Sequence, residues 1–90
     1  MSLSDGIVPR LGHGFRLQWE PAQGCHVLLY PEGMVKLNRS AGEILQRCDG
    51  RASLAHLVGE LEAAFGRAGL RQDVEAFLEL AARQRWVVLE

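Results

Sequence analysis

The sequence has little of what metalloproteins, secreted proteins and membrane proteins need. Its two cysteines cannot form a disulfide framework, and its three histidines lack the spacing of a zinc site. No apolar run approaches the roughly 20 residues that span a bilayer. The N-terminus also lacks the basic and apolar regions of a secretory signal. We therefore expect a cytoplasmic protein with reduced thiols, no bound metal and no membrane contact.

Catalytic motifs are absent as well. The ten glycines form neither a dinucleotide-binding motif nor a P-loop, and no serine lies in a nucleophile elbow. Ten Lys plus Arg face eleven Asp plus Glu, so the overall basic charge that favours binding to nucleic-acid backbones is missing. These absences predict a protein that binds another molecule, with no catalytic residue and no cofactor of its own.

What is present predicts one small α+β domain. Ninety residues, 48% of them hydrophobic, are enough for a single core. Residues 1–14 contain Gly, Ser and Pro with little periodicity, which indicates an extended or mobile N-terminal arm. Residues 15–90 carry the periodic patterns and are expected to form the domain.

The first half of this domain is predicted to be a three-stranded meander. Phe15–Glu20 alternates apolar and polar residues, and Cys25–Tyr30 is rich in residues that favour strands. Tyr30-Pro31-Glu32-Gly33 suits a type I turn, after which Met34–Leu37 forms a short third strand. Short connections make the strands antiparallel. The third strand is expected at the edge of the sheet.

The second half is predicted to be helical. Ser40 and Glu43 match a capping box at the start of an amphipathic helix. Ser53 is placed to cap a second helix, which Gly66 ends.

A third helix is expected to begin between Leu70 and Asp73 and to end near Arg85, and Trp86–Leu89 can add a short terminal strand. The predicted fold is thus α+β, a three-stranded antiparallel sheet followed by a three-helix cluster. The short turn between the first two helices makes it winged-helix-like.

An edge strand offers the clearest candidate for a binding surface. Its outer backbone groups can pair with an extended peptide, and neighbouring side chains then select among peptides. Met34–Leu37 is the candidate edge, and the third helix is the candidate second wall of a groove. The same pattern fits residues that only fill the core.

The residues also carry a family resemblance, which extends from about Pro9 to Leu80. Its most specific part is the pattern LLxPE…LN…A…IL…CDG between Leu28 and Gly50. On these residues the chain resembles the pyrroloquinoline quinone (PQQ) biosynthesis protein D family. Glu20 and Ser40 stand where the family more often has Asp and Thr, and both keep the chemistry. The remaining matching residues are Pro9, Arg16, Leu17, Trp19, Leu61, Phe65, Asp73, Val74, Phe77 and Leu78.

The resemblance implies a non-catalytic peptide chaperone with a winged-helix-like recognition element. Such proteins bind the ribosomal PQQ precursor peptide and present it to the radical S-adenosylmethionine (radical SAM) enzyme that cross-links its Glu and Tyr. The family binds the peptide as an added strand between the third strand and the third helix. Carried onto this sequence, the peptide-binding residues are Met34, Val35, Lys36, Leu37, Asp73, Val74, Phe77, Leu78 and Ala81.

Two other functions stay open at this point, together with one assembly. Arg67, Arg71, Arg83 and Arg85 could form a local basic patch of a winged-helix nucleic-acid-binding domain. Trp19, Tyr30, Phe65, Phe77 and Trp86 could stack on the ring of a quinone in a small carrier. An exposed edge strand and an extended arm would also allow a homodimer by strand or arm exchange.

Overall fold

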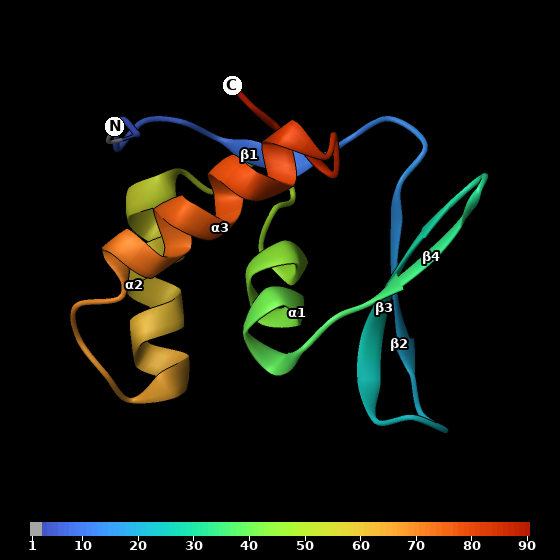
Figure 1. Ribbon diagram of the computed structural model, residues 1–90. Coiled ribbons are helices and arrows are strands. Elements are labelled where there is room, and N and C mark those ends of the chain that lie inside the picture. The colour runs from blue at the N-terminus through green and yellow to red at the C-terminus, as the bar shows by residue number, and fades with distance from the viewer. Residues whose placement is uncertain (1–2) are drawn as a thin grey trace.

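The fold is α+β, as predicted, with strands before helices and one further strand at the C-terminus. A computed structural model describes residues 3–90 (Figure 1). The elements are β1 (Pro9–Leu11), β2 (Arg16–Glu20), β3 (Cys25–Tyr30), β4 (Gly33–Lys36), α1 (Arg39–Gln46), α2 (Leu54–Phe65), α3 (Arg71–Arg83) and β5 (Val87–Leu89). Across these described residues, no helix has the length and apolar character needed to cross a membrane.

Strands β2, β3 and β4 form the predicted antiparallel meander, in that order. Leu28, at the centre of β3, pairs with Leu17 on one side and Val35 on the other. Because paired residues project from the same face, these three side chains turn the same face of the sheet toward the core, where Leu28 is completely buried. The prediction that the third strand of the meander lies at an edge is confirmed.

Helix α1 begins earlier than the capping-box motif predicts. Its N-cap is Asn38, whose side-chain oxygen accepts a hydrogen bond from the Ala41 amide at 2.8 Å. The predicted reciprocal pair of Ser40 and Glu43 is therefore wrong, and Glu43 instead binds Arg47 at 2.7 Å. Asn is at least as good an N-cap as Ser, and Asn38 follows the strand almost at once, so the helix starts there.

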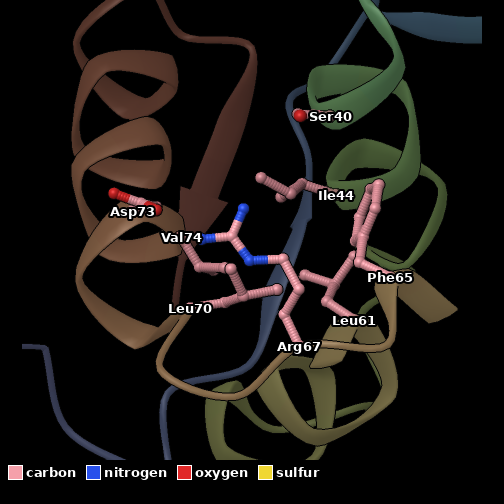
Figure 2. Close-up of a pocket in the computed structure, with 8 residues that line it drawn as sticks. All are labelled: Ser40, Ile44, Leu61, Phe65, Arg67, Leu70, Asp73 and Val74. Atoms are coloured by element: carbon pink, nitrogen blue, oxygen red, sulfur yellow. The ribbon is translucent and has the colours of Figure 1, made fainter. Parts of the chain in front are cut away.

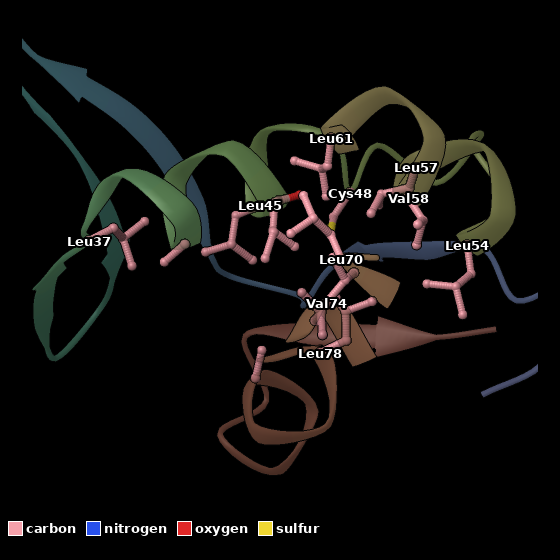
Figure 3. Packing of buried hydrophobic residues seen from close by; sticks show 14 of the residues in the cluster. Leu37, Leu45, Cys48, Leu54, Leu57, Val58, Leu61, Leu70, Val74 and Leu78 are labelled. Carbon is pink, nitrogen blue, oxygen red and sulfur yellow. The ribbon is translucent and has the colours of Figure 1, made fainter. Parts of the chain in front are cut away.

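Helices α2 and α3 follow the sequence signals closely. Ser53 caps α2 by accepting a hydrogen bond from the His56 amide, and Gly66 ends it with a left-handed φ of 63°. Helix α3 begins at Arg71, within the predicted range, and ends at Arg83, slightly before the predicted end. Figure 3 shows side chains from all three helices meeting in one apolar cluster, which includes Leu45, Leu57, Leu61, Val74 and Leu78.

Helix α1 lies directly against the sheet because of a glycine. A Cβ built on Gly42 would lie 2.8 Å from His26 Nδ1 and 3.2 Å from His26 Cβ. These separations are too short for a side chain larger than hydrogen, so Gly42 permits the close packing of α1 on β3. Figure 1 shows the result, with α1 between the sheet and the pair α2 and α3.

Part of the predicted arm belongs to the folded structure. Pro9–Leu11 form β1, which pairs antiparallel with β5 in a separate two-stranded sheet and confirms the terminal strand. Further along the arm, the Leu54 amide at the start of α2 donates to the Ile7 carbonyl at 2.7 Å. Arg71 forms an ion pair with Asp5 and thereby links the arm to α3. Residues 1–2 of the predicted arm lie outside the described residues.

Candidate functional site

The free edge of β4 presents the backbone of two residues to solvent. The Leu37 amide donates to the His26 carbonyl of β3 at 3.0 Å, and Val35 is paired with Leu28. Hydrogen-bonded and non-hydrogen-bonded pairs alternate along antiparallel strands, so the Val35 amide also faces β3. The amides and carbonyls of Met34 and Lys36 therefore point away from the sheet. These are the groups that can pair with one more strand.

The side chains of the predicted edge divide between surface and core. Met34 is 50% exposed and Lys36 is exposed, whereas Val35 is half-buried and Leu37 is only 6% exposed. Val35 and Leu37 turn toward the core face, because alternate residues of a strand point to opposite sides. Met34 and Lys36 thus offer both backbone and side chain to a ligand.

Helix α3 contributes less accessible surface than its sequence pattern indicates. Val74, Leu78 and Ala81 are buried and belong to the hydrophobic core. Asp73 is exposed, and Phe77 is half-buried beside Trp86, with ring centroids 6.5 Å apart. Of the five candidates on α3, Asp73 and Phe77 are therefore the ones with substantial exposed surface.

Between β4 and α3 lies α1, which the sequence reasoning did not include in the site. A cavity of about 140 Å³ opens between α1, the end of α2 and the start of α3 (Figure 2). Of the predicted site residues, Asp73 and Val74 line it. The sequence had not assigned the other lining residues to the peptide site, although Arg67 and Phe65 were candidates for the two alternative functions. These other residues are Ser40, Ile44, Leu61, Phe65, Arg67 and Leu70.

The electrostatics of this cavity come from side chains without ionic partners. Within residues 3–90, neither Arg39 nor Arg67 forms an ion pair. The Arg39 guanidinium lies over the Phe65 ring, 4.7 Å from its centroid. Arg67 rises from the α2–α3 connection into the space between Val74 and Ile44 (Figure 2). The cavity thus combines a mainly apolar lining with the cation of Arg67 and the carboxylate of Asp73, and Arg39 lies beside it over the Phe65 ring.

Of the two cysteines, Cys48 is buried and poorly suited to act as a nucleophile. Burial, aided by the neighbouring Asp49 charge, raises the pKa of the Cys48 thiol to about 12, so this thiol stays protonated at neutral pH. Its sulfur contacts the Ile44 carbonyl oxygen at 3.3 Å. Cys25 begins β3 and is partly exposed. Among the described residues, no group of three or more His, Cys, Asp or Glu side chains is arranged to hold a metal ion.

The alternative nucleic-acid site loses one of its four cations. Arg71 binds Glu75 at 2.6 Å and also pairs with Asp5. Its charge is therefore neutralised by two carboxylates, both of which would repel a phosphate backbone.

The aromatic residues of the alternative quinone site pair with other neighbours. Tyr30 lies beside Phe15 with centroids 5.5 Å apart, and Trp19 contacts His26 edge-on at 5.0 Å. Phe65 lines the cavity between the helices, whereas Trp19 lines a separate hollow beside the β2–β3 turn. The described geometry therefore does not bring the five rings to one ring-sized cavity.

Comparison with known proteins identifies the family. The family model described as "Coenzyme PQQ synthesis protein D (PqqD)" matches residues 25–87. A "PqqA binding protein" of Pseudomonas aeruginosa (strain UCBPP-PA14) is 57% identical over 84 residues, which cover 92% of this chain and 91% of that protein. A protein of the same name from Azotobacter vinelandii (strain DJ) is 54% identical, covering 91% of this chain and 90% of the relative.

A solved structure agrees with this assignment. The solution NMR structure of the PqqD truncation of Methylobacterium extorquens PqqCD superposes with a TM-score of 0.78 and 29% identity, covering 97% of this chain and 95% of that one. That truncation is described as a functional, stand-alone recognition element for ribosomally synthesised and post-translationally modified peptides. The expected family is therefore confirmed by a family model, by sequence relatives and by a shared fold, and the chain belongs to the family of coenzyme PQQ synthesis protein D (PqqD).

Proposed function

We propose that this chain binds the PQQ precursor peptide, PqqA, as an added strand along β4 and presents it to a radical SAM enzyme without catalysing a step itself. The relatives' name, PqqA binding protein, and the recognition-element description of the NMR structure support peptide binding. The observation that carries the site is the open β4 edge, where the Met34 and Lys36 backbones face outward.

The chemistry of this edge explains how one surface can hold a flexible peptide. Each backbone hydrogen bond contributes about 0.5–1.5 kcal/mol, and two outward residues offer up to four such bonds. Main-chain pairing gives affinity that depends little on the peptide's side chains. Selectivity then has to come from side chains next to the edge, such as Met34, and from the predicted second wall, where Phe77 and Asp73 are accessible.

A matched pair of substitutions at Lys36 tests the strand-addition mechanism. Lys36→Pro removes the outward amide without removing a bond to β3, and proline is tolerated on edge strands in this orientation. Lys36→Ala removes the side chain and keeps the amide. In calorimetric titration with synthetic PqqA peptide, we expect Lys36→Pro to bind at least about tenfold more weakly than Lys36→Ala. Equal affinity of the two folded variants would contradict pairing at this amide.

Presentation to the enzyme is a second, separable part of the proposal. In an assay with the radical SAM enzyme and PqqA, the wild-type chain should increase formation of the Glu–Tyr cross-link, and Lys36→Pro should do so less. The chain and peptide without the enzyme should yield no cross-linked product. Cross-linking that is equally fast without the chain would contradict the presenting role while leaving peptide binding intact.

A further inference from the structure

The two free arginines beside the helical cavity point to a second recognition element, separate from the β4 backbone. Arg39 is the first residue of α1, and Arg67 follows the left-handed Gly66 that ends α2. Both side chains are exposed, and within the described chain neither has a carboxylate within ion-pair distance. Other arginines of this small domain do pair, including Arg10, Arg47 and Arg71. Arg16, Arg51, Arg83 and Arg85 also have no ion-pair partner among the described residues, so the feature that distinguishes Arg39 and Arg67 is their position beside an apolar cavity.

The cavity itself has the size and lining of a side-chain pocket. Its floor consists of Ile44, Leu61, Leu70 and Val74, all buried, and Phe65 forms one wall. A volume of about 140 Å³ is close to that of engineered apolar cavities that bind a benzene-sized group. A mainly apolar lining with Ser40, Arg67 and Asp73 as its polar residues suits one apolar side chain whose neighbour carries a charge.

The position of the cavity relative to β4 makes it reachable by the same ligand. Three residues separate Lys36, the last residue of β4, from Ser40, which stands at the rim of the cavity. An extended chain advances about 3.3 Å per residue, so a strand paired with β4 needs only a few more residues to reach Ser40. Arg67 and Phe65, with Arg39 over its ring, then lie at the same cavity.

We propose that this cavity reads an apolar side chain of the precursor peptide, and that Arg67 and Arg39 bind a carboxylate side chain next to it. The proposal rests on the proposed function, because the peptide must first be held at β4. A guanidinium suits this role, since it can give a carboxylate two parallel hydrogen bonds. The Arg39 guanidinium is also held in place by its contact with the face of the Phe65 ring. Asp73 is the one carboxylate of the lining, and its negative charge disfavours a peptide carboxylate close to α3.

The test uses charge reversal at Arg67 with a matched control at Arg51. Arg51 is exposed and, within the described residues, has no ion-pair partner, but it lies in the α1–α2 turn away from the cavity. Binding of synthetic PqqA peptide is measured by titration at low and moderate salt. We expect Arg67→Glu to weaken binding at least tenfold, with a weaker dependence on salt, and Arg51→Glu to change it less than twofold.

Peptide variants identify the carboxylate. Each Asp and Glu of the peptide is replaced in turn by Asn or Gln, and each variant is titrated into wild-type and Arg67→Ala proteins. One replacement should weaken binding to the wild type several-fold and have no further effect on Arg67→Ala. If all replacements weaken both proteins equally, or if Arg67→Glu behaves like Arg51→Glu, the subsite is wrong.

These outcomes are distinct from failure of the proposed function. If the wild-type chain does not bind the peptide, or if Lys36→Pro binds as well as Lys36→Ala, the function or the β4 site fails. If Lys36→Pro alone weakens binding and both Arg67 variants bind normally, the β4 site stands and the carboxylate subsite falls.

A Ser40→Phe variant tests the apolar pocket separately, because a ring at the rim should block the pocket and weaken peptide binding several-fold. Unchanged affinity of folded Ser40→Phe would overturn the pocket.

Discussion

The helical half of the molecule and its three-stranded sheet differ in how they use apolar side chains. In α1, α2 and α3, completely or almost completely buried leucines meet in one cluster, and β1 and β5 are paired with each other. In the sheet, Trp19 is 53% and Met34 50% exposed, and β4 leaves one side of its backbone unpaired. The contrast indicates that the helices supply most of the buried cluster, joined by Leu28 of β3, while β4 keeps a free edge for recognition.

The largest expected effect tests whether the buried leucines of the helical half stabilise the fold. Leu57 of α2 is completely buried, so Leu57→Ala should lower the free energy of unfolding by about 2–5 kcal/mol in urea denaturation. Leu80 of α3 is 43% exposed, and Leu80→Ala should change the free energy of unfolding by less than about 0.5 kcal/mol. Similar losses for both would mean that the cluster does not dominate stability.

Within the sheet, two adjacent prolines should separate stability from binding. Val35→Pro removes an amide that faces β3 and should cost about 2 kcal/mol, because it also leaves the Leu28 carbonyl without its partner. Met34→Pro removes an outward amide and should cost less than about 1 kcal/mol while weakening peptide binding. Thermal denaturation and titration of both variants check this. A larger stability loss for Met34→Pro would reverse the assigned orientation of the strand.

Alanine substitutions at two glycines test the contact between α1 and the sheet, with Gly42 at the contact and Gly59 as the control. Gly42→Ala places a methyl group against His26 and should destabilise the protein by about 1–3 kcal/mol. Gly59 lies within α2 with open space around it, so Gly59→Ala should stabilise by about 0.5–1 kcal/mol through helix propensity. If both substitutions stabilise, α1 does not need the close approach to β3.

The smallest expected effect concerns acid stability at the α1–α2 turn. Hydrogen bonds from the backbone amides of Ala52 and Arg51 lower the pKa of Asp49 below its usual value. A lowered pKa in the folded state adds stability at higher pH, and that stability is lost as pH falls through the lowered pKa. Asp49→Asn keeps an acceptor oxygen but cannot titrate. Its urea midpoint should therefore fall slightly less than that of the wild type between about pH 5 and pH 3. A steeper fall would contradict this role.

Local sequence signals predicted most of the fold. Alternation and short turns indicated the meander, and Ser53 and Gly66 marked the ends of α2 where the structure has them. The pairing of β1 with β5 was not predicted as such, because two three-residue strands nearly 80 residues apart carry no shared local pattern. The start of α1 was misassigned because Asn38 and Ser40 are both good caps, and only the geometry of the strand exit distinguishes them.

The candidate site was harder to predict. The edge strand could be found from sequence, but which amides face outward depends on register, which Val35 and Met34 do not reveal by themselves. The contribution of α1 and Arg67 depends on how three helices pack, and no local pattern encodes it. The homodimer by strand or arm exchange and the cytoplasmic location stay predictions.

The most direct test of the account is hydrogen exchange at the two edges of the sheet, with and without PqqA peptide. The outward amides are Met34 and Lys36 on β4 and, by the same alternation, Leu17 and Trp19 on β2. NMR-detected exchange should slow at Met34 and Lys36 when the peptide binds and stay unchanged at Leu17 and Trp19. Protection at Leu17 and Trp19 instead, or binding without new protection at Met34 and Lys36, would contradict strand addition at β4.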